Sequence, residues 1–274
     1  MATRVQHAPT QGGVGPVLRD WRRRRHLSQL ALALEAGISQ RHLSFIESGR
    51  AQPSREMLLQ IAEALGVPLR ARNGLLLAAG YAPTFAERPL LDPALDAARR
   101  AVERVLRGHE PYPAVAIDRH WTLLFANNAA STLLEGIAPP LLEPPLNVLR
   151  LSLHPDGLAP RILNYHEWRR HILDRLQHQA ESTADAELDE LIAELKGYPA
   201  PVSRRGPSVG LDGAGVFVPL QIATPLGVLS LISTTTVFSG PMDVTLAEIV
   251  LECFFPADRA TADRLSSAGG RLSP

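Results

Sequence analysis

Residues 27–54 carry the pattern that most restricts what this chain can fold into. Ser28 is placed to cap a helix over "QLALALEA", and Gly37 follows where a helix commonly ends in a left-handed residue. Ser39 is placed to cap a second short helix, "QRHLSFIES", and Gly49 stops it. Gly37 thus supplies a sharp reversal between two short helices, and the pattern predicts a helix-turn-helix.

Three further short helices are predicted around this pair. One surrounds Trp21, where the apolar spacing first becomes helical, one is "REMLLQIAEALGV" after the cap Ser54, and one is "RARNGLLLAAG". Together the five helices predict a compact all-α domain over residues 15–80, behind a flexible N-terminus at 1–14.

A change of composition separates this domain from the rest of the chain. The sequence "YAPTFAERPLLDP" is rich in proline, and an amphipathic helix is predicted to follow it at about 94–107. Residues 81–108 are therefore interpreted as a linker and a linker helix.

The remaining sequence alternates between strand and helix signals. The elements predicted from it are, in order, a β-hairpin at 113–126, a short helix in "NNAASTLL", amphipathic helices at 164–179 and 183–196, a long loop in "YPAPVSRRGPSVGLDGAG", strands in "VFVPLQIAT" and "GVLSLISTTTVF", and a closing helix in "DVTLAEIVLECFF". This order predicts an α+β domain with a mostly antiparallel sheet at 109–258, and a flexible tail at 259–274.

Charge divides the chain in a similar place. Residues 1–88 hold twelve Arg against six Asp or Glu, a balance of +6 that leaves −6 for residues 89–274. This asymmetry indicates a polyanionic partner for the first part only. The single cysteine, Cys253, excludes an intrachain disulfide, and no segment has the ~18 apolar residues of a membrane span or the h-region of a signal peptide. We therefore expect a cytoplasmic protein that does not enter a membrane.

A helical wheel of the second helix shows which side chains are free to contact a partner. Leu43 and Ile46 lie close together on the wheel and define its buried side. The far side and the N-terminal edge carry Gln40, Arg41, Ser44, Phe45 and Ser48. In a helix-turn-helix, residues in these places meet base edges in the major groove of DNA.

These side chains have different chemical options. Arg41 matches guanine O6 and N7 and Gln40 matches adenine, and each such pair contributes ~1–3 kcal/mol of discrimination. Phe45 makes no such bond, so its options are apolar contact with a thymine methyl, packing on a partner subunit, or plain exposure. His42 flanks the buried face, where packing or half-exposure is the simpler expectation.

Residues 27–54 also resemble the helix-turn-helix of the XRE family, to which the phage repressors and Cro belong. The shared spacings comprise Ser28-Gln29, Leu32-Ala33, Ala36-Gly37-Ile38-Ser39, Leu43-Ser44, Ile46-Glu47, Gly49-Arg50 and Pro53-Ser54. The resemblance implies a lambda-repressor-like domain that binds double-stranded DNA. It also implies base-facing positions for Gln40, Arg41, Ser44 and Phe45.

Further roles come from the same resemblance. It implies that Gln29 binds a phosphate and braces Gln40, and that Arg50 meets the DNA backbone. A buried salt bridge between Arg22 and Glu47 is implied as a structural element. Ser39 is a candidate DNA contact, but helix capping is the favoured explanation of this residue.

Much of the remaining chain resembles the MmyB-like ligand-binding domain, a PAS-like fold found behind XRE heads in bacterial regulators. The resemblance is carried by "AIDRHWTLLFANNAASTLL", "PPLNVLRLSLHPDGLAPRILNYHEWRRHIL" and "TPLGVLSLISTTTVFSGPMDVTLAEIVLECFFPAD". It implies an apolar cavity for a small hydrophobic ligand such as a fatty acid. Candidate lining residues are Trp121, Phe125, Leu149, Trp168, Ile172, Phe217 and Phe238, and candidate partners of a ligand carboxylate are Asn127, Arg150, His154 and Arg169. Plain core packing or structural hydrogen bonding is the alternative for each.

Catalysis is not expected from this sequence. Cys253 lies in an apolar run, where an inert buried thiol is the simpler interpretation. His166, His171 and His178 lack the i, i+4 spacing of a helical metal pair, and the sequence has no glycine-rich phosphate loop. No metal or cofactor is therefore predicted.

The predicted function is a bacterial transcription regulator that binds a palindromic operator as a homodimer, because one short helix contacts too few bases. The helix at 94–107 and the ligand domain are the expected dimerisation surfaces. A hydrophobic ligand would shift the relative placement of the two DNA-binding domains of the dimer, provided that it binds one arrangement more tightly than the other. The alternative is a protein-interaction or adaptor module without a small-molecule ligand.

Overall fold

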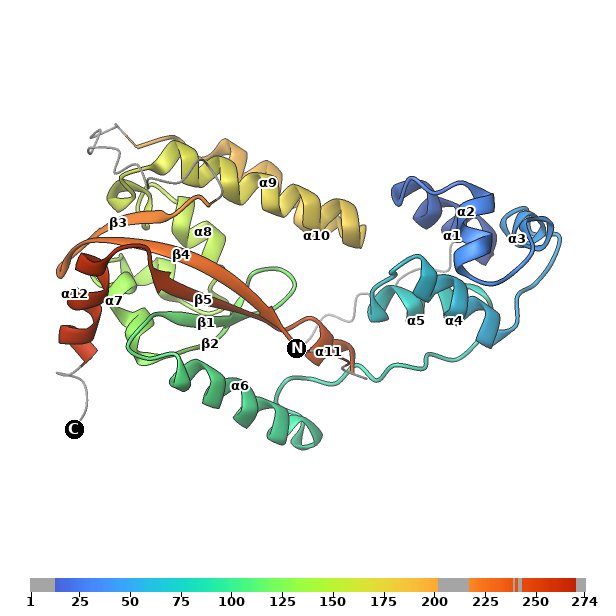
Figure 1. Cartoon of the computed structure of the whole chain (residues 1–274), viewed down its shortest axis with the longest axis horizontal. Helices are drawn as coiled ribbons and strands as arrows, with labels where there is room; N and C mark the ends of the chain where they lie inside the picture. Colours follow the sequence, from blue (N-terminus) through green and yellow to red (C-terminus); the bar gives the residue numbers. More distant parts are fainter. Residues whose placement is uncertain (1–12, 202–216, 239, 241–242, 270–274) are drawn as a thin grey trace. The chain divides into compact units, whose positions relative to one another are not determined.

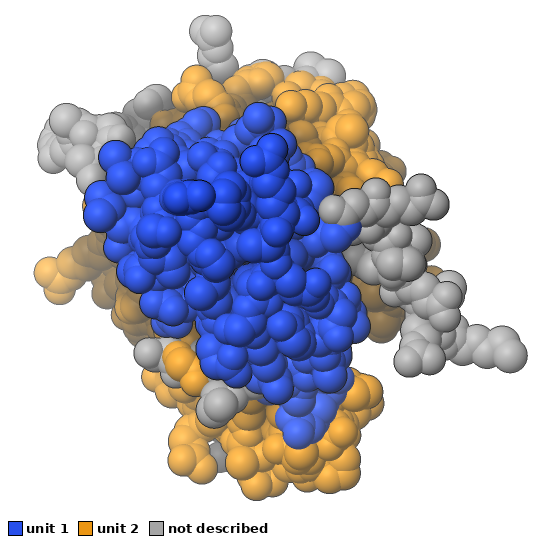
Figure 2. Space-filling view, turned by 90° about the vertical axis from the view of Figure 1, so that its right-hand side faces the viewer, with its two compact units in different colours: residues 1–88, 181–183, 242–244 blue, residues 89–180, 184–241, 245–274 orange. Residues whose placement is uncertain are grey.

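The computed structural model describes residues 13–201, 217–238, 240 and 243–269 (Figure 1). The chain divides into two compact units, which Figure 2 shows in different colours. The N-terminal unit comprises residues 1–88 with 181–183 and 242–244, and the C-terminal unit comprises 89–180, 184–241 and 245–274. Three expectations lie wholly or partly outside the described residues: the flexible N-terminus, the long loop before the last strands and the end of the tail.

The N-terminal unit consists of five helices, as predicted. They are α1 (Val14–Arg24), α2 (Gln29–Glu35), α3 (Gln40–Glu47), α4 (Arg55–Ala64) and α5 (Leu69–Ala78). The hydroxyls of Ser28, Ser39 and Ser54 each accept a hydrogen bond from the backbone N–H three residues further on. Gly37 has a φ of 61°, so it supplies the left-handed turn between α2 and α3.

The core of this unit is built from side chains that the helical periodicity turns inward. Its fully buried members are Leu18, Leu32, Leu43, Ile46, Leu58, Ile61, Leu65, Leu75 and Leu76. Each contributes roughly 1.5–3 kcal/mol of burial relative to an exposed side chain. Helices α1 and α3 approach closely at Gly15, because a Cβ on this residue would lie 2.5 Å from the carbonyl oxygen of Ile46.

The first part of the predicted linker is fastened to α5. The Asn73 amide nitrogen donates to the Phe85 carbonyl oxygen at 2.7 Å, and its side-chain oxygen accepts from the backbone N–H groups of Thr84 and Phe85. Asn73 is nearly buried, so residues 84 and 85 belong to the N-terminal unit and not to a free connection.

The C-terminal unit is an α+β domain that contains the elements named next, except residues 181–183 at the end of α9 and Val244 at the start of α11. Its helices are α6 (Asp96–Gly108), α7 (Ser131–Leu134), α8 (Val148–Leu153), α9 (Tyr165–Thr183), α10 (Ala186–Gly197), α11 (Val244–Ala247) and α12 (Arg259–Gly269), with short 3-10 turns at Pro93–Leu95, Asn128–Ala130, Pro139–Leu142 and Ala159–Arg161. Its strands are β1 (Ala114–Ile117), β2 (Leu123–Ala126), β3 (Leu220–Thr224), β4 (Gly227–Val237) and β5 (Val250–Pro256). The strands pair antiparallel in the order β2-β1-β5-β4-β3, which confirms the predicted sheet.

The predicted closing helix in "DVTLAEIVLECFF" is wrong. Only Val244–Ala247 is helical there, and Val250–Pro256 forms β5, the central strand of the sheet. A short apolar run covered on both faces has no period that separates strand from helix, and here the hydrogen bonds of β1 and β4 decide the outcome.

The expected flexible tail from residue 259 is also corrected. Helix α12 contains Thr261 and Leu265, which are almost completely buried, and the Thr261 hydroxyl accepts a hydrogen bond from the backbone N–H of Ser230 on β4. The mostly polar composition of this segment concealed its two inward-facing residues, so composition alone was a poor guide.

The sheet separates two apolar layers (Figure 1). Helix α6 covers one face, where Val102 and Leu106 pack with Ala116 and Leu251. Helices α8, α9 and α10 lie on the other side with the larger core cluster. Within the described residues, no helix combines the length and the apolar character needed to cross a membrane.

Candidate nucleic-acid interface and ligand cavity

Helix α3 presents the predicted DNA-facing residues away from the core. Leu43 and Ile46 are completely buried, whereas Gln40 and Arg41 are exposed. Among the other predicted contacts, Ser39 and Arg50 are exposed, and Gln29, Ser44 and Phe45 are partly exposed. The wheel drawn from the sequence therefore matches the burial of this helix.

A buried ion pair fixes α3 against α1. Glu47 is 1% exposed, and its carboxylate accepts two hydrogen bonds from Arg22, at 2.6 Å from Nε and 2.9 Å from the second terminal nitrogen. Arg22 also donates to the carbonyl oxygen of Leu27, and Arg19 donates to that of Glu47. Burial raises the pKa of the Glu47 carboxyl, but the hydrogen bonds from Arg22 and Gln29 and the nearby positive charge outweigh it, so its pKa lies below the ordinary value.

Gln29 takes part in the same cluster. Its amide nitrogen donates to Glu47 Oε2 at 2.9 Å. The resemblance implied that Gln29 braces Gln40, but in this structure the partner of its amide nitrogen is Glu47. Gln29 thus connects the start of α2 to the end of α3.

Phe45 supports the guanidinium group of Arg41. The Arg41 Cζ lies 5.4 Å from the centroid of the Phe45 ring, as expected for residues one helical turn apart. The Phe45 carbonyl oxygen also accepts hydrogen bonds from the backbone N–H groups of Arg50 and Ala51. The i, i+4 spacing of Arg41 and Phe45 was a signal for this contact, which the sequence reasoning did not use.

A cavity of about 110 Å³ lies in the C-terminal unit, on the side of the sheet opposite α6. Most of its wall is apolar and comes from the sheet, α7, α8 and α9. These apolar residues include Val115, Trp121, Leu123, Leu133, Leu134, Leu146, Val148, Leu149, Leu151, Trp168, Ile172 and Phe254. The few polar lining residues are Ser152, His171, Arg175, Ser233 and Glu252.

One stripe of α9 supplies part of this wall. Trp168, His171, Ile172 and Arg175 follow the i, i+3, i+4, i+7 spacing of a single helix face. Facing them, strand alternation places Glu252 and Phe254 of β5 on the same side of the sheet. An interruption of an apolar stripe by His171 and Arg175 was a sequence signal for the polar part of the cavity.

Arg175 and Glu252 form an ion pair in the cavity wall. The pair has two hydrogen bonds, one of them 3.1 Å long between an Arg175 terminal nitrogen and Glu252 Oε2. Arg175 also donates to the Thr235 hydroxyl at 2.7 Å, and its Cζ lies 4.6 Å from the centroid of the Trp121 ring. Glu252 is 4% exposed, so its charge is compensated inside the protein.

His171 lies beside this pair. Burial lowers the pKa of its imidazole, the positive charge of Arg175 lowers it further, and Asp174 and Glu252 oppose this without reversing it. The ring is therefore neutral at neutral pH. Trp168, whose ring is 5.5 Å from that of His171, donates its indole N–H to the Ser152 hydroxyl at 3.0 Å.

Four of the seven predicted apolar lining residues line the cavity, and three lie elsewhere. Those that line the cavity are Trp121, Leu149, Trp168 and Ile172. Phe125 and Phe238 pack with the cluster on the α6 side of the sheet, and Phe217 is 64% exposed. A β-bulge in the pairing of β1 with β2 puts one extra residue between Leu123 and Phe125, so Phe125 faces the α6 side although Leu123 lines the cavity. The sequence reasoning did not foresee this bulge.

The predicted polar partners of a ligand lie away from the cavity. Their hydrogen bonds are made within the protein: Asn127 with the backbone of Leu106, Tyr112, Ala114 and Ala130, Arg150 with Glu194, His154 with the backbone N–H of Asp156, and Arg169 with the carbonyl oxygens of Leu195 and Lys196. These contacts agree with the alternative given in the sequence analysis, that each of these residues makes structural hydrogen bonds.

The turn between β1 and β2 holds Trp121 at the cavity. Asp118 Oδ1 accepts hydrogen bonds from the backbone N–H groups of His120 and Thr122, at 2.9 and 2.8 Å. The Asn147 amide donates to the carbonyl oxygen of His120 at 2.7 Å. Trp121 has a φ of 67°, which is unusual for a bulky residue, so these hydrogen bonds maintain a backbone that would otherwise relax.

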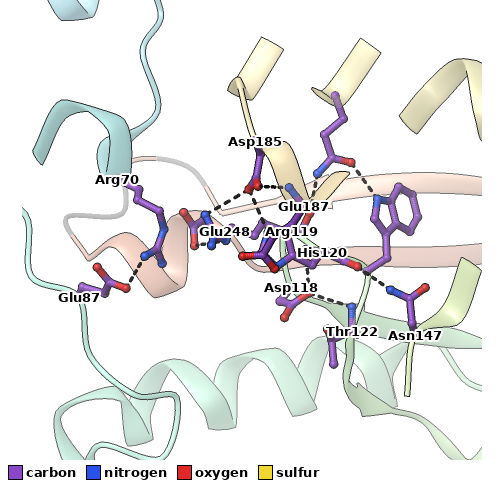
Figure 3. A network of polar contacts seen from close by, with 12 residues as sticks. Arg70, Glu87, Asp118, Arg119, His120, Thr122, Asn147, Asp185, Glu187 and Glu248 are labelled. Atoms are coloured by element: carbon purple, nitrogen blue, oxygen red, sulfur yellow. Dashed lines mark hydrogen bonds and ion pairs between the residues drawn. The ribbon is translucent and has the colours of Figure 1, made fainter. Parts of the chain in front are cut away.

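Ionic contacts tie the same turn to the start of α10. His120 lies between Asp185 and Glu187, with nitrogen–oxygen distances of 2.9 and 3.2 Å (Figure 3). Arg119 pairs with Asp185 at 3.3 Å and with Glu248 at 3.8 Å. His120, Asp185 and Glu187 are metal-ligand types within 4.8 Å of one another, but Asp185 is already paired with Arg119. We interpret the cluster as an ionic clamp.

Cys253 faces the α6 side of the sheet and is 7% exposed. Burial raises the pKa of its thiol, and the carboxylate of Glu252 raises it further. Such a thiol is a poor nucleophile at neutral pH.

Comparison with known proteins identifies both parts of the chain. Residues 18–71 match the family described as Helix-turn-helix, and residues 98–268 match the MmyB-like transcription regulator ligand binding domain. No match was found among curated proteins.

Two solved structures show limited similarity. The clp gene regulator ClgR from Corynebacterium glutamicum is 28% identical, over 36% of this chain and 90% of that one, with a TM-score of 0.22. An RNA-binding light-oxygen-voltage receptor is 14% identical, over 99% of this chain and 64% of that one, with a TM-score of 0.27. TM-scores this low do not establish a common fold.

The family matches contain the two surfaces described above. Helix α3 and its buried ion pair lie within the helix-turn-helix match, and the cavity lies within the ligand-binding match, which covers more than half of the chain. The chain therefore belongs to the family of the MmyB-like transcription regulator ligand-binding domain, here preceded by an XRE-type helix-turn-helix.

Proposed function

We propose that this DNA-binding regulator is cytoplasmic and binds a two-fold operator as a homodimer, with α3 in the major groove. The observation that carries the proposal is the burial of α3: Leu43 and Ile46 are completely inside, while Gln40 and Arg41 are exposed. The charge of +6 on residues 1–88 suits a polyanion. Helix α6 and the C-terminal unit remain the proposed dimerisation surfaces.

Each outward side chain has a proposed task. Arg41 and Gln40 contact base edges, and Ser44 and Phe45 lie beside them in the groove. Ser39 and Arg50 flank the reading helix at its two ends and bind phosphates, and Gln29 at the start of α2 binds another phosphate.

Replacing Arg50 with alanine should weaken binding to all DNA sequences by a similar factor, because a phosphate contact carries no sequence information. The slope of log K against log salt concentration should fall by about 1. Fluorescence anisotropy with operator and random duplexes, at several salt concentrations, measures both. A loss confined to the operator would contradict the phosphate assignment.

The same salt series distinguishes this proposal from an adaptor that recruits a protein partner. Phosphate contacts release counterions, so the affinity of the unmodified protein must fall steeply as salt rises. A flat response would favour the adaptor.

Replacing Phe45 with alanine should reduce base discrimination at the position contacted by Arg41, because the guanidinium loses its aromatic support. The expected effect is about 0.5–1 kcal/mol, the size of an exposed cation–π contact. A double-mutant cycle with Arg41→Ala measures the coupling. Additive effects would point instead to an independent contact of Phe45 with a thymine methyl, and loss of the dimer would place Phe45 in a subunit interface.

The C-terminal unit is proposed to bind a small hydrophobic molecule whose apolar part fills the cavity. The walls from Trp121, Leu149 and Ile172 suit a hydrocarbon group such as that of a fatty-acid-like ligand. Binding controls DNA affinity only if the ligand favours one arrangement of the dimer. Mass spectrometry of the purified protein under native conditions tests for a retained ligand, and operator binding with and without it tests the coupling.

A further inference from the structure

The polar part of the cavity is already neutral as a whole. Glu252 lies in the central strand, directly opposite Val115 of β1 and Thr235 of β4. Both of its carboxylate oxygens are bonded to Arg175, and the Thr235 hydroxyl donates to Oε1 at 3.1 Å. One buried negative charge is thus matched by one positive charge.

Both terminal nitrogens of Arg175 already have hydrogen-bond partners, which limits the binding of a second anion. One terminal nitrogen is shared between Glu252 and Thr235, the other is bonded to Glu252, and the guanidinium lies over Trp121. A ligand carboxylate would have to displace Glu252 or approach it closely. The first leaves a buried carboxylate without its partner, and the second places a negative charge beside Glu252, whose side chain is only 5% exposed.

The remaining polar groups at this place are uncharged. Burial and the charge of Arg175 lower the pKa of His171, so its imidazole offers one donor and one acceptor at neutral pH. Ser233 lines the cavity from β4, opposite Phe254 in the strand register. A hydroxyl or amide group would find hydrogen-bond partners here without disturbing the ion pair.

The space also limits the apolar part of the ligand. An apolar cavity of about 150 Å³ holds benzene. The present cavity, at about 110 Å³, suits a short hydrocarbon segment in the conformation described.

We propose that the cavity selects a short, uncharged amphiphile, whose hydroxyl or amide group lies at the Arg175–Glu252 pair, over a carboxylate of the same shape. This inference rests on the proposed ligand-binding function of the C-terminal unit. Glu252 determines the selection, because it already binds the Arg175 guanidinium that a ligand carboxylate would need as its partner.

The test compares heptanamide with heptanoate, which have the same shape and differ in charge. Binding of each to the purified full-length chain at pH 7.5 is measured by isothermal titration calorimetry. Heptanamide should bind at least about tenfold more tightly, a difference of about 1.4 kcal/mol. In Glu252→Gln, Arg175 loses its counter-charge, so heptanoate binding should strengthen about tenfold and the preference should narrow or reverse.

Glu194→Gln is the matched control. It removes a carboxylate from another Arg–Glu pair, with Arg150, that is more exposed and lies outside the cavity lining. Its ligand preference should equal that of the unmodified chain.

The possible outcomes distinguish a failure of this inference from a failure of the proposed ligand-binding function. Tighter binding of heptanoate to the unmodified chain overturns the selection for an uncharged group while the ligand-binding function stands. Binding of neither compound overturns both. The comparison on the unmodified chain decides the matter even if Glu252→Gln does not fold.

Discussion

Replacing Arg22 with alanine is expected to lower the free energy of unfolding of the N-terminal unit by about 3–5 kcal/mol, the cost of breaking a buried ion pair on one side. Glu47 would remain in the core with its carboxylate deprived of two hydrogen bonds, and its contact with Gln29 would not replace them. Chemical denaturation followed by circular dichroism measures the loss.

Acid should diminish this difference. The pKa of Glu47 is lowered by folding, so the stabilisation from the pair is present above the unfolded-state pKa and is lost as pH falls through the folded value. Without Arg22, burial favours the protonated acid, so the variant regains stability as pH falls through the raised pKa of its Glu47. The difference in unfolding free energy between the two proteins is therefore largest near pH 7, begins to narrow above the ordinary carboxyl pKa, and narrows further as pH falls through the lowered pKa of Glu47 in the unmodified protein.

Arg23→Ala is the control for this prediction. Arg23 lies next to Arg22 on α1 and is exposed, so the substitution removes the same charge and a similar side chain from the same helix. Its effect should stay within about 0.5 kcal/mol. Equal losses in the two variants would refute the role assigned to the Arg22–Glu47 pair.

Replacing Arg41 with alanine should remove about 1–3 kcal/mol of discrimination at one base pair of each half-site, since a bidentate contact with guanine would be lost. Affinity for random DNA should change much less, because Arg50 and the other proposed phosphate contacts are untouched. Competition of operator duplexes with all four base pairs at each position measures the change.

The comparison with Arg50→Ala makes this prediction specific. Arg41→Ala should flatten preference at one position, whereas Arg50→Ala should lower affinity at every sequence while keeping the preferences. If Arg41→Ala weakens all duplexes equally, Arg41 contacts the backbone and another residue of α3 supplies the discrimination.

The helical head could be predicted almost entirely from sequence because its signals are local. The serine caps, the positive φ of Gly37 and the inward spacing of Leu43 and Ile46 all act within one or two helical turns. The buried ion pair between Arg22 and Glu47, in contrast, joins residues far apart in sequence, and it was predicted only from the family resemblance.

The C-terminal unit was less predictable because its decisive contacts are distant in sequence. Strand β5 owes its conformation to two neighbours, β1 and β4, that its own residues do not reveal. The helix interpretation of this segment also hid Glu252, since only a strand's alternation places it with Phe254 at the cavity. Arg175 was missed for the same reason: its partner was assigned to the wrong element.

The position of Trp121 and Trp168 gives the chain a built-in optical reporter. Two of its three tryptophans line the cavity, and the third, Trp21, is 6% exposed in the core of the head. Indole emission responds to the polarity and charge around the ring, and a cation lies over Trp121. Entry of a ligand would therefore change the fluorescence of the protein itself, against a steady background from Trp21, without any attached dye.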